Sequence, residues 1–315
     1  MVPAGRDYRR VMVDKLFDEA GAQGFLYVRE VGGTDEVAMA ADAPVVLASV
    51  VKVIVAVAFA RAVVAGELDP AEVVTVPARY QVGGAGTAGC SGPVTMTLAD
   101  LALFMLTMSD NAATDVIFQR VGHPAVNAVV EDLGLHNTHV RGDIESVLLS
   151  IVTDLALPEP TDVDDRIAEA GPAAVWALSC IDPARTNAST ARDIGTLLEA
   201  IWTDRAAPPR ACALVRSWMS QAFTTHGLAA AFPDGVKVAA KTGTLPAIRN
   251  EAGVVTYPDG RSYVVAAFTR AHTLTDRQPA IDVAIGAAAR AAVDHLRAHL
   301  TLDPSRPDRS THLTL

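Results

Sequence analysis

The feature that most constrains this sequence is a long apolar stretch with one lysine near its start. From Val50 to Val64 every residue is apolar except Lys52 and Arg61. Such a run predicts a helix from Ser49 to about Ala65 that is buried on most sides. A buried ammonium group costs free energy unless another group pairs with it. Lys52 therefore needs polar partners inside the fold, or a reason to lose its charge.

Ser49 lies three residues before Lys52, which places both side chains on one face of the helix. A lysine desolvated among valines and alanines has a lowered pKa and can take the proton of a neighbouring hydroxyl, which then becomes a nucleophile. The alternative is structural: Ser49 caps the helix, and Lys52 extends its amine to the surface. Both interpretations fit this stretch taken alone.

Composition excludes several classes of protein. The chain has 315 residues, of which 50% are apolar, and this is ample for one large core. A formal net charge of -10 without any block of Lys or Arg disfavours binding to nucleic acid or to an anionic membrane surface. We expect a globular protein whose partner is a small-molecule substrate.

Targeting and metal signals are also weak. The start "MVPAGRDYRRVMVDKLFDEAGAQG" reads as an amphipathic helix rather than a secretory signal, so we expect a cytoplasmic protein. We expect no apolar run to approach the ~20 residues that span a bilayer. The cysteines Cys90, Cys180 and Cys212 are widely spaced and predict free thiols. The eight histidines show no HxxxH or HExxH spacing, so no metal and no cofactor is expected.

Strand patterns stand at the two ends of the chain, and helical patterns lie between them. We expect strands at 24–30, 36–42, 236–244 and 261–270, with a further strand in "NEAGVVTYPDG". We expect helices at 97–108, 111–122, 123–134, 189–202, 211–223 and 282–300. Two segments read as loops: Gly-rich 81–93, and 141–187 with one helical piece near 163–176.

This order predicts an α+β fold in which one antiparallel sheet is completed from both termini and is flanked by helices. Residues 1–300 would form a single domain, with an α/β lobe from 1–48 and 207–300 and an inserted all-α lobe from 49–206. Two independent domains would leave the N-terminal hairpin marginally stable by itself. The polar tail 301–315 is predicted to be disordered.

Two further motifs carry groups that are useful in acyl transfer. "SDN", at Ser109 to Asn111, follows an apolar helix, and it reads either as a helix cap or as a hydroxyl and an amide that face a substrate. "KTG", at Lys241 to Gly243, ends a strand pattern. Random placement would give roughly 0.15 Ser-x-x-Lys pairs and about 0.02 Lys-Thr-Gly tripeptides in such a chain.

Together and in this order, the three motifs resemble the SxxK, SDN and KTG signature of class A β-lactamases and related penicillin-recognising serine enzymes. The resemblance extends from about Tyr8 to Leu300, and it includes "TLADLALFMLTMSDNAATD" and "KTGTLPAIRNEAGVV". It implies the β-lactamase/DD-peptidase-like fold, with an active site in the crevice between the two lobes.

The resemblance also implies roles for individual residues. Ser49 would be acylated, Lys52 would be its general base or proton relay, and Ser109 would pass a proton to the leaving nitrogen. Asn111 would bind the amide side of the substrate. A substrate carboxylate would be held by Lys241, Thr242, Gly243 and Thr244 of the strand, with Arg249 as a further candidate. The backbone N–H groups of Ser49 and Thr244 would form the oxyanion hole.

One element of the family pattern is missing from its expected place. Class A enzymes carry a glutamate, in an ExxLN pattern, that activates the water which releases the acyl group. The corresponding stretch here falls near Ala174 to Ser179, in "AAVWALSCID", and contains no glutamate. Glu169 and Asp182 flank this stretch. Each is either a substitute for the missing glutamate or an ordinary surface carboxylate.

The sequence therefore predicts a serine hydrolase or acyl-transfer enzyme that forms an acyl-Ser49 intermediate with a β-lactam, an amide or an ester. One alternative is a cytoplasmic biosynthetic acyltransferase or esterase. Another is a penicillin-binding sensor or binding domain that does not turn over.

Overall fold

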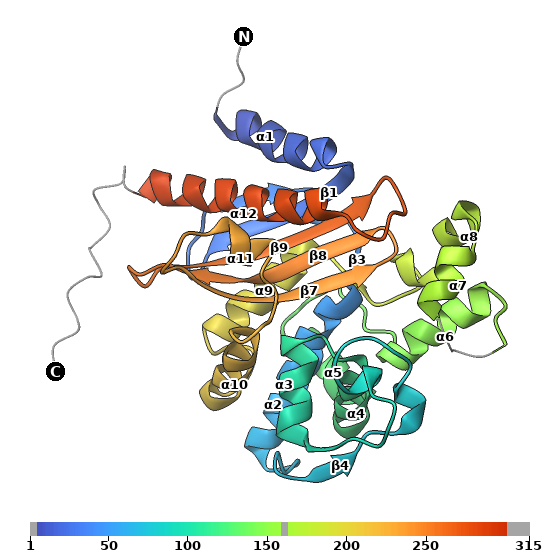
Figure 1. Cartoon of the computed structure of the whole chain (residues 1–315). Helices are drawn as coiled ribbons and strands as arrows, with labels where there is room; N and C mark the ends of the chain where they lie inside the picture. Colours follow the sequence, from blue (N-terminus) through green and yellow to red (C-terminus); the bar gives the residue numbers. More distant parts are fainter. Residues whose placement is uncertain (1–4, 159–162, 301–315) are drawn as a thin grey trace.

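One antiparallel sheet joins the two ends of the chain. The computed structural model describes residues 5–158 and 163–300. Its five-stranded sheet has the order β2-β1-β9-β8-β7. The strands are β1 (Ala22–Glu30), β2 (Glu36–Met39), β7 (Lys237–Leu245), β8 (Ile248–Thr256) and β9 (Ser262–Ala271). The N-terminal hairpin is thus the continuation of the C-terminal strands, which confirms the predicted α+β architecture (Figure 1).

Helices cover both faces of this sheet. α1 (Gly5–Glu19), α12 (Pro279–Leu300) and the short α11 (Leu228–Ala231) pack on one face (Figure 1). α9 (Ala191–Trp202) packs on the other, against β1 and β9. Strand β9 is buried from Tyr263 to Thr269, as a strand covered on both faces must be. The sheet therefore separates two apolar cores, one under α12 and the other shared with the helical lobe.

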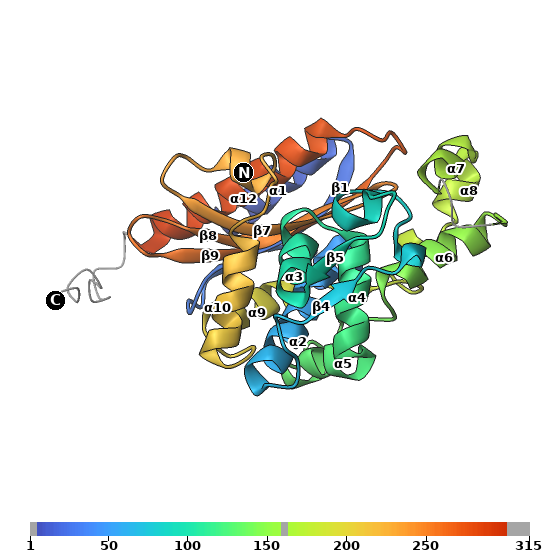
Figure 2. The same cartoon turned by 60° about the horizontal axis from the view of Figure 1, so that its bottom comes forward.

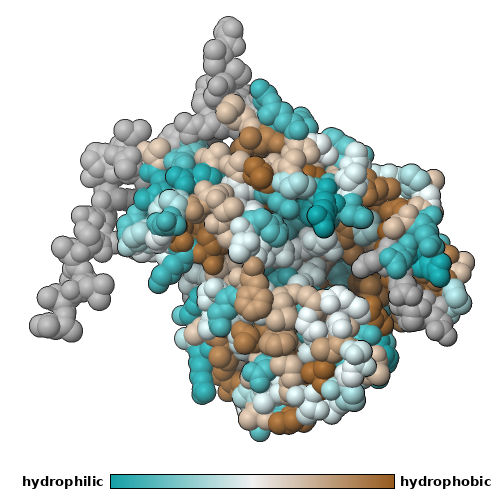
Figure 3. Space-filling view, viewed as in Figure 1, coloured by the Kyte–Doolittle hydropathy of each residue, from teal (hydrophilic) through white to brown (hydrophobic). Residues whose placement is uncertain are grey.

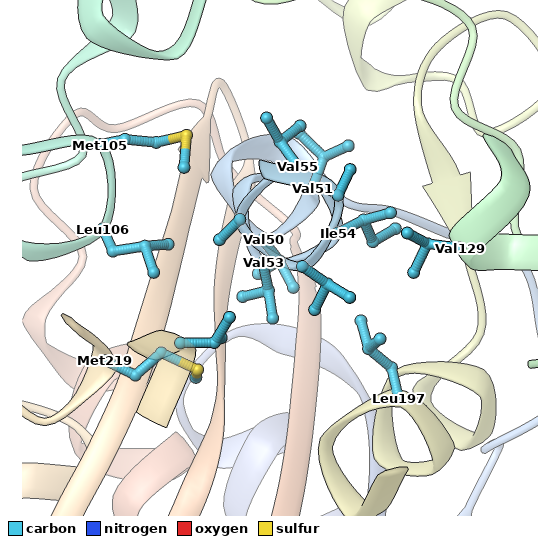
Figure 4. Close-up of a cluster of buried hydrophobic side chains, with 14 of the residues drawn as sticks. Val50, Val51, Val53, Ile54, Val55, Met105, Leu106, Val129, Leu197 and Met219 are labelled. Carbon is cyan, nitrogen blue, oxygen red and sulfur yellow. The ribbon is translucent and has the colours of Figure 1, made fainter. Parts of the chain in front are cut away.

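The apolar stretch forms the central helix of the helical lobe. A 3-10 turn, η1 (Ala48–Val50), passes directly into α2 (Val51–Ala65), which ends at Gly66 in the left-handed conformation with φ 76°. Around α2 lie α3 (Leu98–Thr107), α4 (Asn111–Val121), α5 (His123–Asp132) and α10 (Pro209–Met219). Figure 4 shows valines and Ile54 of this helix pointing in different directions toward Met105, Val129, Leu197 and Met219.

The same stretch corrects one expectation from the sequence. By length and composition Ala48–Ala65 could cross a membrane, although we expected no such run. In the fold 67% of that window is buried inside the protein. The apolarity is explained by neighbours on most sides of α2, as expected for a helix in the core of a protein.

The segment 141–187 is more helical than predicted. It contains α6 (Ile144–Asp154), which we expected to be loop, and the predicted helix near 163–176 is divided into α7 (Val163–Glu169) and α8 (Pro172–Trp176). Asp143 caps α6 by accepting the Ser146 N–H at 2.9 Å, and this helix start went unrecognised. Figure 2 shows the three helices at one side of the helical lobe.

The remaining elements are short. They are β3 (Val45–Val46), paired with β6 (Ala188–Ser189), β4 (Val73–Thr75), paired with β5 (Thr95–Thr97), and the 3-10 turns η2 (Ala78–Tyr80), η3 (Gly86–Gly89) and η4 (Ser179–Ile181). The helix predicted from residue 189 begins at Ala191 instead, because Thr190 is its cap. The helix predicted at 211–223 is α10, which ends at Met219. Residues 301–315, the predicted tail, lie outside the described residues.

Candidate active site

Lys52 lies at the bottom of the site, fully buried in the first turn of α2. Its Nζ donates to the backbone oxygen of Ser109 and to Oδ1 of Asn111, both at 2.7 Å, and contacts Ser109 Oγ at 3.2 Å. The first two partners are pure acceptors, so they bind two N–H groups whether the amine is charged or neutral. A neutral amine then has its lone pair left to accept a proton from a hydroxyl.

The protonation state of Lys52 is set mainly by burial. Removal from water lowers its pKa from 10.5 to about 7, against the opposing effect of the Asp115 and Asp110 carboxylates. At neutral pH a substantial fraction of the side chain is therefore an amine. This answers the question raised by the sequence, because the apolar helix supplies the desolvation that leaves part of the lysine uncharged and able to accept a proton.

Ser49 is half-buried and lies one turn before Lys52 in the same continuous helical stretch. Two asparagines fix the backbone that leads into it. Asn250 Nδ2 donates to the oxygen of Val46 at 2.8 Å, and the Leu47 N–H donates to the oxygen of Asn187 at 2.9 Å. Neither asparagine belongs to a recognised motif, and their positions became evident only from the fold.

Strand β7, the edge strand with the KTG motif, runs beside this turn. A Cβ atom on Gly243 would lie 2.8 Å from the oxygen of Leu47 and 3.3 Å from the nitrogen of Ser49. Glycine is therefore required here by close approach, since any side chain would push β7 away from Ser49. Thr244, the next residue, is exposed at the end of the strand.

The SDN motif turns sharply between α3 and α4. Ser109 has a φ of 62°, a conformation that is uncommon for a residue with a side chain. Asp110 is fully buried and caps α4 by accepting the Ala113 N–H at 3.0 Å, while its second oxygen accepts the Thr87 N–H at 2.5 Å. Asp110 thus ties the Gly-rich loop to the motif, which leaves Ser109 and Asn111 facing Lys52.

Lys241 and Thr242 form the floor of a groove of about 280 Å³ between β7 and the end of α3. Lys241 is only 2% exposed, and its Nζ donates to the oxygen of Thr242 at 2.9 Å. Burial and the nearby charge of Lys52 hold its pKa well below the usual value. Ser109 also lines the groove, so the structure brings two of the motifs to one cavity. Figure 3 shows the surface hollowed between the lobe of the sheet and the helical lobe.

Arg249 is engaged elsewhere. Its guanidinium donates to the oxygens of Ile248 at 2.9 Å and of Leu245 at 3.3 Å, and also to the backbone oxygen of Asp276. These bonds pin the turn between β7 and β8. Arg249 is not among the residues that line the groove at Lys241, so the structure gives it a bracing position near the site.

The two carboxylates that flank the gap in the family pattern are surface groups. Glu169 is paired with Arg166 at 2.8 Å and Asp182 with Arg185 at 3.0 Å, and all four side chains are more than 40% exposed. A different carboxylate comes closer to the motifs. Glu145, at the start of α6, shares a small pocket of about 30 Å³ with Asn111, and its Oε1 lies 3.6 Å from Arg79 Nε.

Sequence reasoning missed Glu145 because α6 itself was read as loop. Asp115 holds the backbone there: its two oxygens accept the N–H groups of Ile144 at 2.7 Å and of Glu145 at 2.9 Å. Burial raises the pKa of Asp115 to about 7. A pocket of this size has room for a water molecule or two among polar groups.

Comparison with known proteins agrees with this arrangement. A model of the β-lactamase enzyme family matches residues 9–296, nearly the whole chain. The protein belongs to that family. The chain is thus a class A β-lactamase-like serine enzyme, and its family supports a serine hydrolase of the β-lactamase type.

Individual relatives differ in what their names say. The chain is 30% identical over 304 residues to the β-lactamase regulatory protein BlaB of Streptomyces cacaoi, with 89% of this chain and 94% of that protein covered. It resembles a β-lactamase from Sphaerobacter thermophilus (24% identity, TM-score 0.73, 94% and 97% of the two chains covered) and PBP-A (21% identity, TM-score 0.71, 91% and 96% covered). At these identities the solved structures establish the fold alone, which is the fold predicted from the motifs.

Proposed function

We propose that this member of the β-lactamase enzyme family is acylated on Ser49 by a carboxylate-bearing amide or ester, with β-lactams as the substrates to test. The observation that carries the proposal is Lys52, which is buried, holds two carbonyl acceptors at 2.7 Å and has a pKa of about 7. An amine in that state can remove a proton from a serine hydroxyl at neutral pH.

In the acylation step Ser49 Oγ attacks the substrate carbonyl carbon while its proton passes to Lys52. The backbone N–H groups of Ser49 and Thr244 would stabilise the oxyanion, and Gly243 permits that close approach. The carbon–nitrogen or carbon–oxygen bond then breaks, and the proton leaves Lys52 through Ser109 to the departing atom. Lys52 returns to its neutral form, ready for a second proton transfer.

Release of the acyl group is the step on which the alternatives differ. The Glu145 carboxylate, beside Asn111, supports hydrolysis through a water in the small pocket. The name of the BlaB relative, a regulatory protein, favours a sensor that stays acylated. Arg79 Nε lies 3.6 Å from Glu145 Oε1 and competes with a water molecule for that carboxylate, so we expect release to be slower than acylation.

Intact-mass measurement over time tests acylation directly. The protein is mixed at pH 7.5 with a penicillin, a cephalosporin and a fluorophosphonate, beside the Ser49→Ala and Lys52→Ala variants. We expect an adduct in the wild type and none with Ser49→Ala. Lys15→Ala, which removes an exposed lysine, is the matched control and should label normally. An adduct that survives in Ser49→Ala would refute the assignment of the nucleophile.

The same time course separates hydrolase from sensor. Return to the free mass within minutes means turnover, and Glu145→Gln should then prolong the adduct about tenfold or more. An adduct stable for hours, and unaffected by Glu145→Gln, means a sensor or a transferase without its acceptor.

A further inference from the structure

One wall of the groove is built by the segment between α10 and α11. Residues 222–226 of this segment line the cavity opposite Ser109, and they include the 68% exposed Phe223. The segment starts below the sheet, at the end of α10, and finishes at α11 on the face covered by α12 (Figure 1). The segment therefore passes around the edge strand β7. The position of this wall of the groove depends on how the two ends of the segment are held.

Its first attachment is to the helical lobe. The Phe223 N–H donates to the backbone oxygen of Thr107 at 3.0 Å, next to the SDN turn. This bond sets the distance between the start of the wall and Ser109. The far end of the wall needs a second attachment on the other side of β7.

That second attachment is Glu251. It lies on β8 opposite Thr242, is 2% exposed, and accepts the Leu228 N–H on Oε2 at 2.8 Å. Gly227 is pressed against the same carboxylate, since a Cβ there would lie 2.0 Å from Oε2. Oε1 is buried and has no hydrogen-bond partner among the described residues. A buried carboxylate with one oxygen outside any hydrogen bond is costly, and its attraction to the nearby charge of Lys241 does not outweigh burial, which raises the pKa of Glu251 to about 7.

We propose that Glu251 is a positioning residue for substrate capture: by holding the Leu228 N–H and Gly227 it fixes the wall of residues 222–226 against Lys241 and Ser109. The inference rests on the proposed acylation of Ser49. It assigns to Glu251 no contact with the substrate and no proton transfer. Its loss should loosen the wall, raise the concentration needed for half-saturation and leave the chemical step of the bound complex unchanged.

Four variants distinguish this role from a general contribution to stability. Glu251→Leu removes the acceptor, whereas Glu251→Gln keeps an acceptor oxygen of the same reach. Glu251→Asp keeps the charge but withdraws it by one methylene. Glu199→Leu is the control for loss of a buried carboxylate. Glu199 accepts the Gly32 N–H at 3.1 Å and pairs with Arg29 at 3.5 Å, and it is not among the residues that line the groove.

The measurements are the concentration dependence of acylation by a penicillin and amide hydrogen exchange of peptides covering 220–228. In Glu251→Leu we expect about a tenfold higher half-saturating concentration, a saturated rate within about twofold of the wild type, and faster exchange in that segment. Glu251→Gln keeps the acceptor and removes only the charge that acts on Lys241, so the saturated rate and the exchange of the segment should stay within about twofold. Glu251→Asp should shift in the same direction by about threefold, and it decides the question if the leucine variant does not fold.

The proposal is overturned if the Glu251 variants change the saturated rate as much as the half-saturation, if exchange in 220–228 is unchanged, or if Glu199→Leu gives the same kinetic shift. Hydrogen exchange requires no substrate. A wild type that is not acylated at Ser49 would therefore refute the proposed function, while the anchoring of the wall is still judged by its exchange.

Discussion

Replacement of Asp115 by asparagine should move the pH dependence of acylation toward lower pH. The Lys52 amine is the proposed base, and its pKa of about 7 is the balance between burial, which lowers it, and the charges of Asp115 and Asp110, which raise it. Asp115→Asn removes the larger of these two charges. Burial raises the pKa of Asp115 itself to about 7, so its carboxylate is largely ionised only above neutral pH, and the pKa of Lys52 should fall by less than one unit.

The magnitudes follow from the shift already present in the wild type. A fall from 10.5 to about 7 means that the ammonium form costs about 5 kcal/mol more in this site than in water. At pH 7 about half of the Lys52 side chains are neutral, whereas an ordinary lysine would have roughly one neutral molecule in 3000. Acylation should thus rise with pH through a midpoint near 7 in the wild type and through a lower midpoint in the variant. Because about half of the Asp115 side chains are protonated at pH 7 and most of them at pH 6, the variant should react only about twofold faster between these pH values.

The assay is the second-order rate constant for acylation by a penicillin between pH 5 and 9. Because Asp115 also accepts the N–H groups of Ile144 and Glu145, thermal unfolding should be recorded for each variant. Asp132→Asn, which alters an exposed carboxylate paired with Arg61, is the control and should not move the midpoint. A midpoint that stays in place or moves upward in Asp115→Asn would refute the assignment of the rise of acylation with pH to Lys52.

Three other substitutions test separate parts of the structure. Gly243→Ala places a methyl group 2.8 Å from the oxygen of Leu47 and should reduce the acylation rate at least tenfold while lowering the melting temperature only slightly; an unchanged rate would argue against the close approach. Arg249→Lys loses backbone hydrogen bonds and should cost about 1–3 kcal/mol in urea unfolding, with acylation within about twofold; a selective loss of binding would instead support contact with a substrate carboxylate. Phe59→Ala in the fully buried face of α2 should cost about 3–5 kcal/mol in the same unfolding assay, and less than 1 kcal/mol would mean that the core is loosely packed.

The sequence contained enough to predict the sheet, the central helix and the meeting of Lys52 with Ser109 and Asn111. Each of these depends on a strong periodic pattern or on a short motif at the end of such a pattern. The cytoplasmic location and the absence of nucleic-acid or membrane partners rest on composition and stay predictions.

Other parts depend on long-range contacts that no local pattern reports. Helix α6 was read as loop because its start is marked only by Asp143, and with it the position of Glu145 was missed. Arg249 stands in the expected stretch, yet its guanidinium is taken up by carbonyl groups, one of them 27 residues away. Glu251 reads as an ordinary strand carboxylate until the segment that follows α10 is seen to fold back over it.

The pairing of β1 with β9 also determines the order in which the molecule can be completed during synthesis. Ala22 pairs with Ala271, a separation of 271 − 22 = 249 residues. Loop closure over such a length is slow, and the strand partner of β1 emerges from the ribosome only when most of the chain has been made. Until then the very apolar α2 has only the helical lobe to cover it. A nascent chain of this kind depends on early assembly of that lobe, or on chaperones, to keep this apolar helix from aggregating.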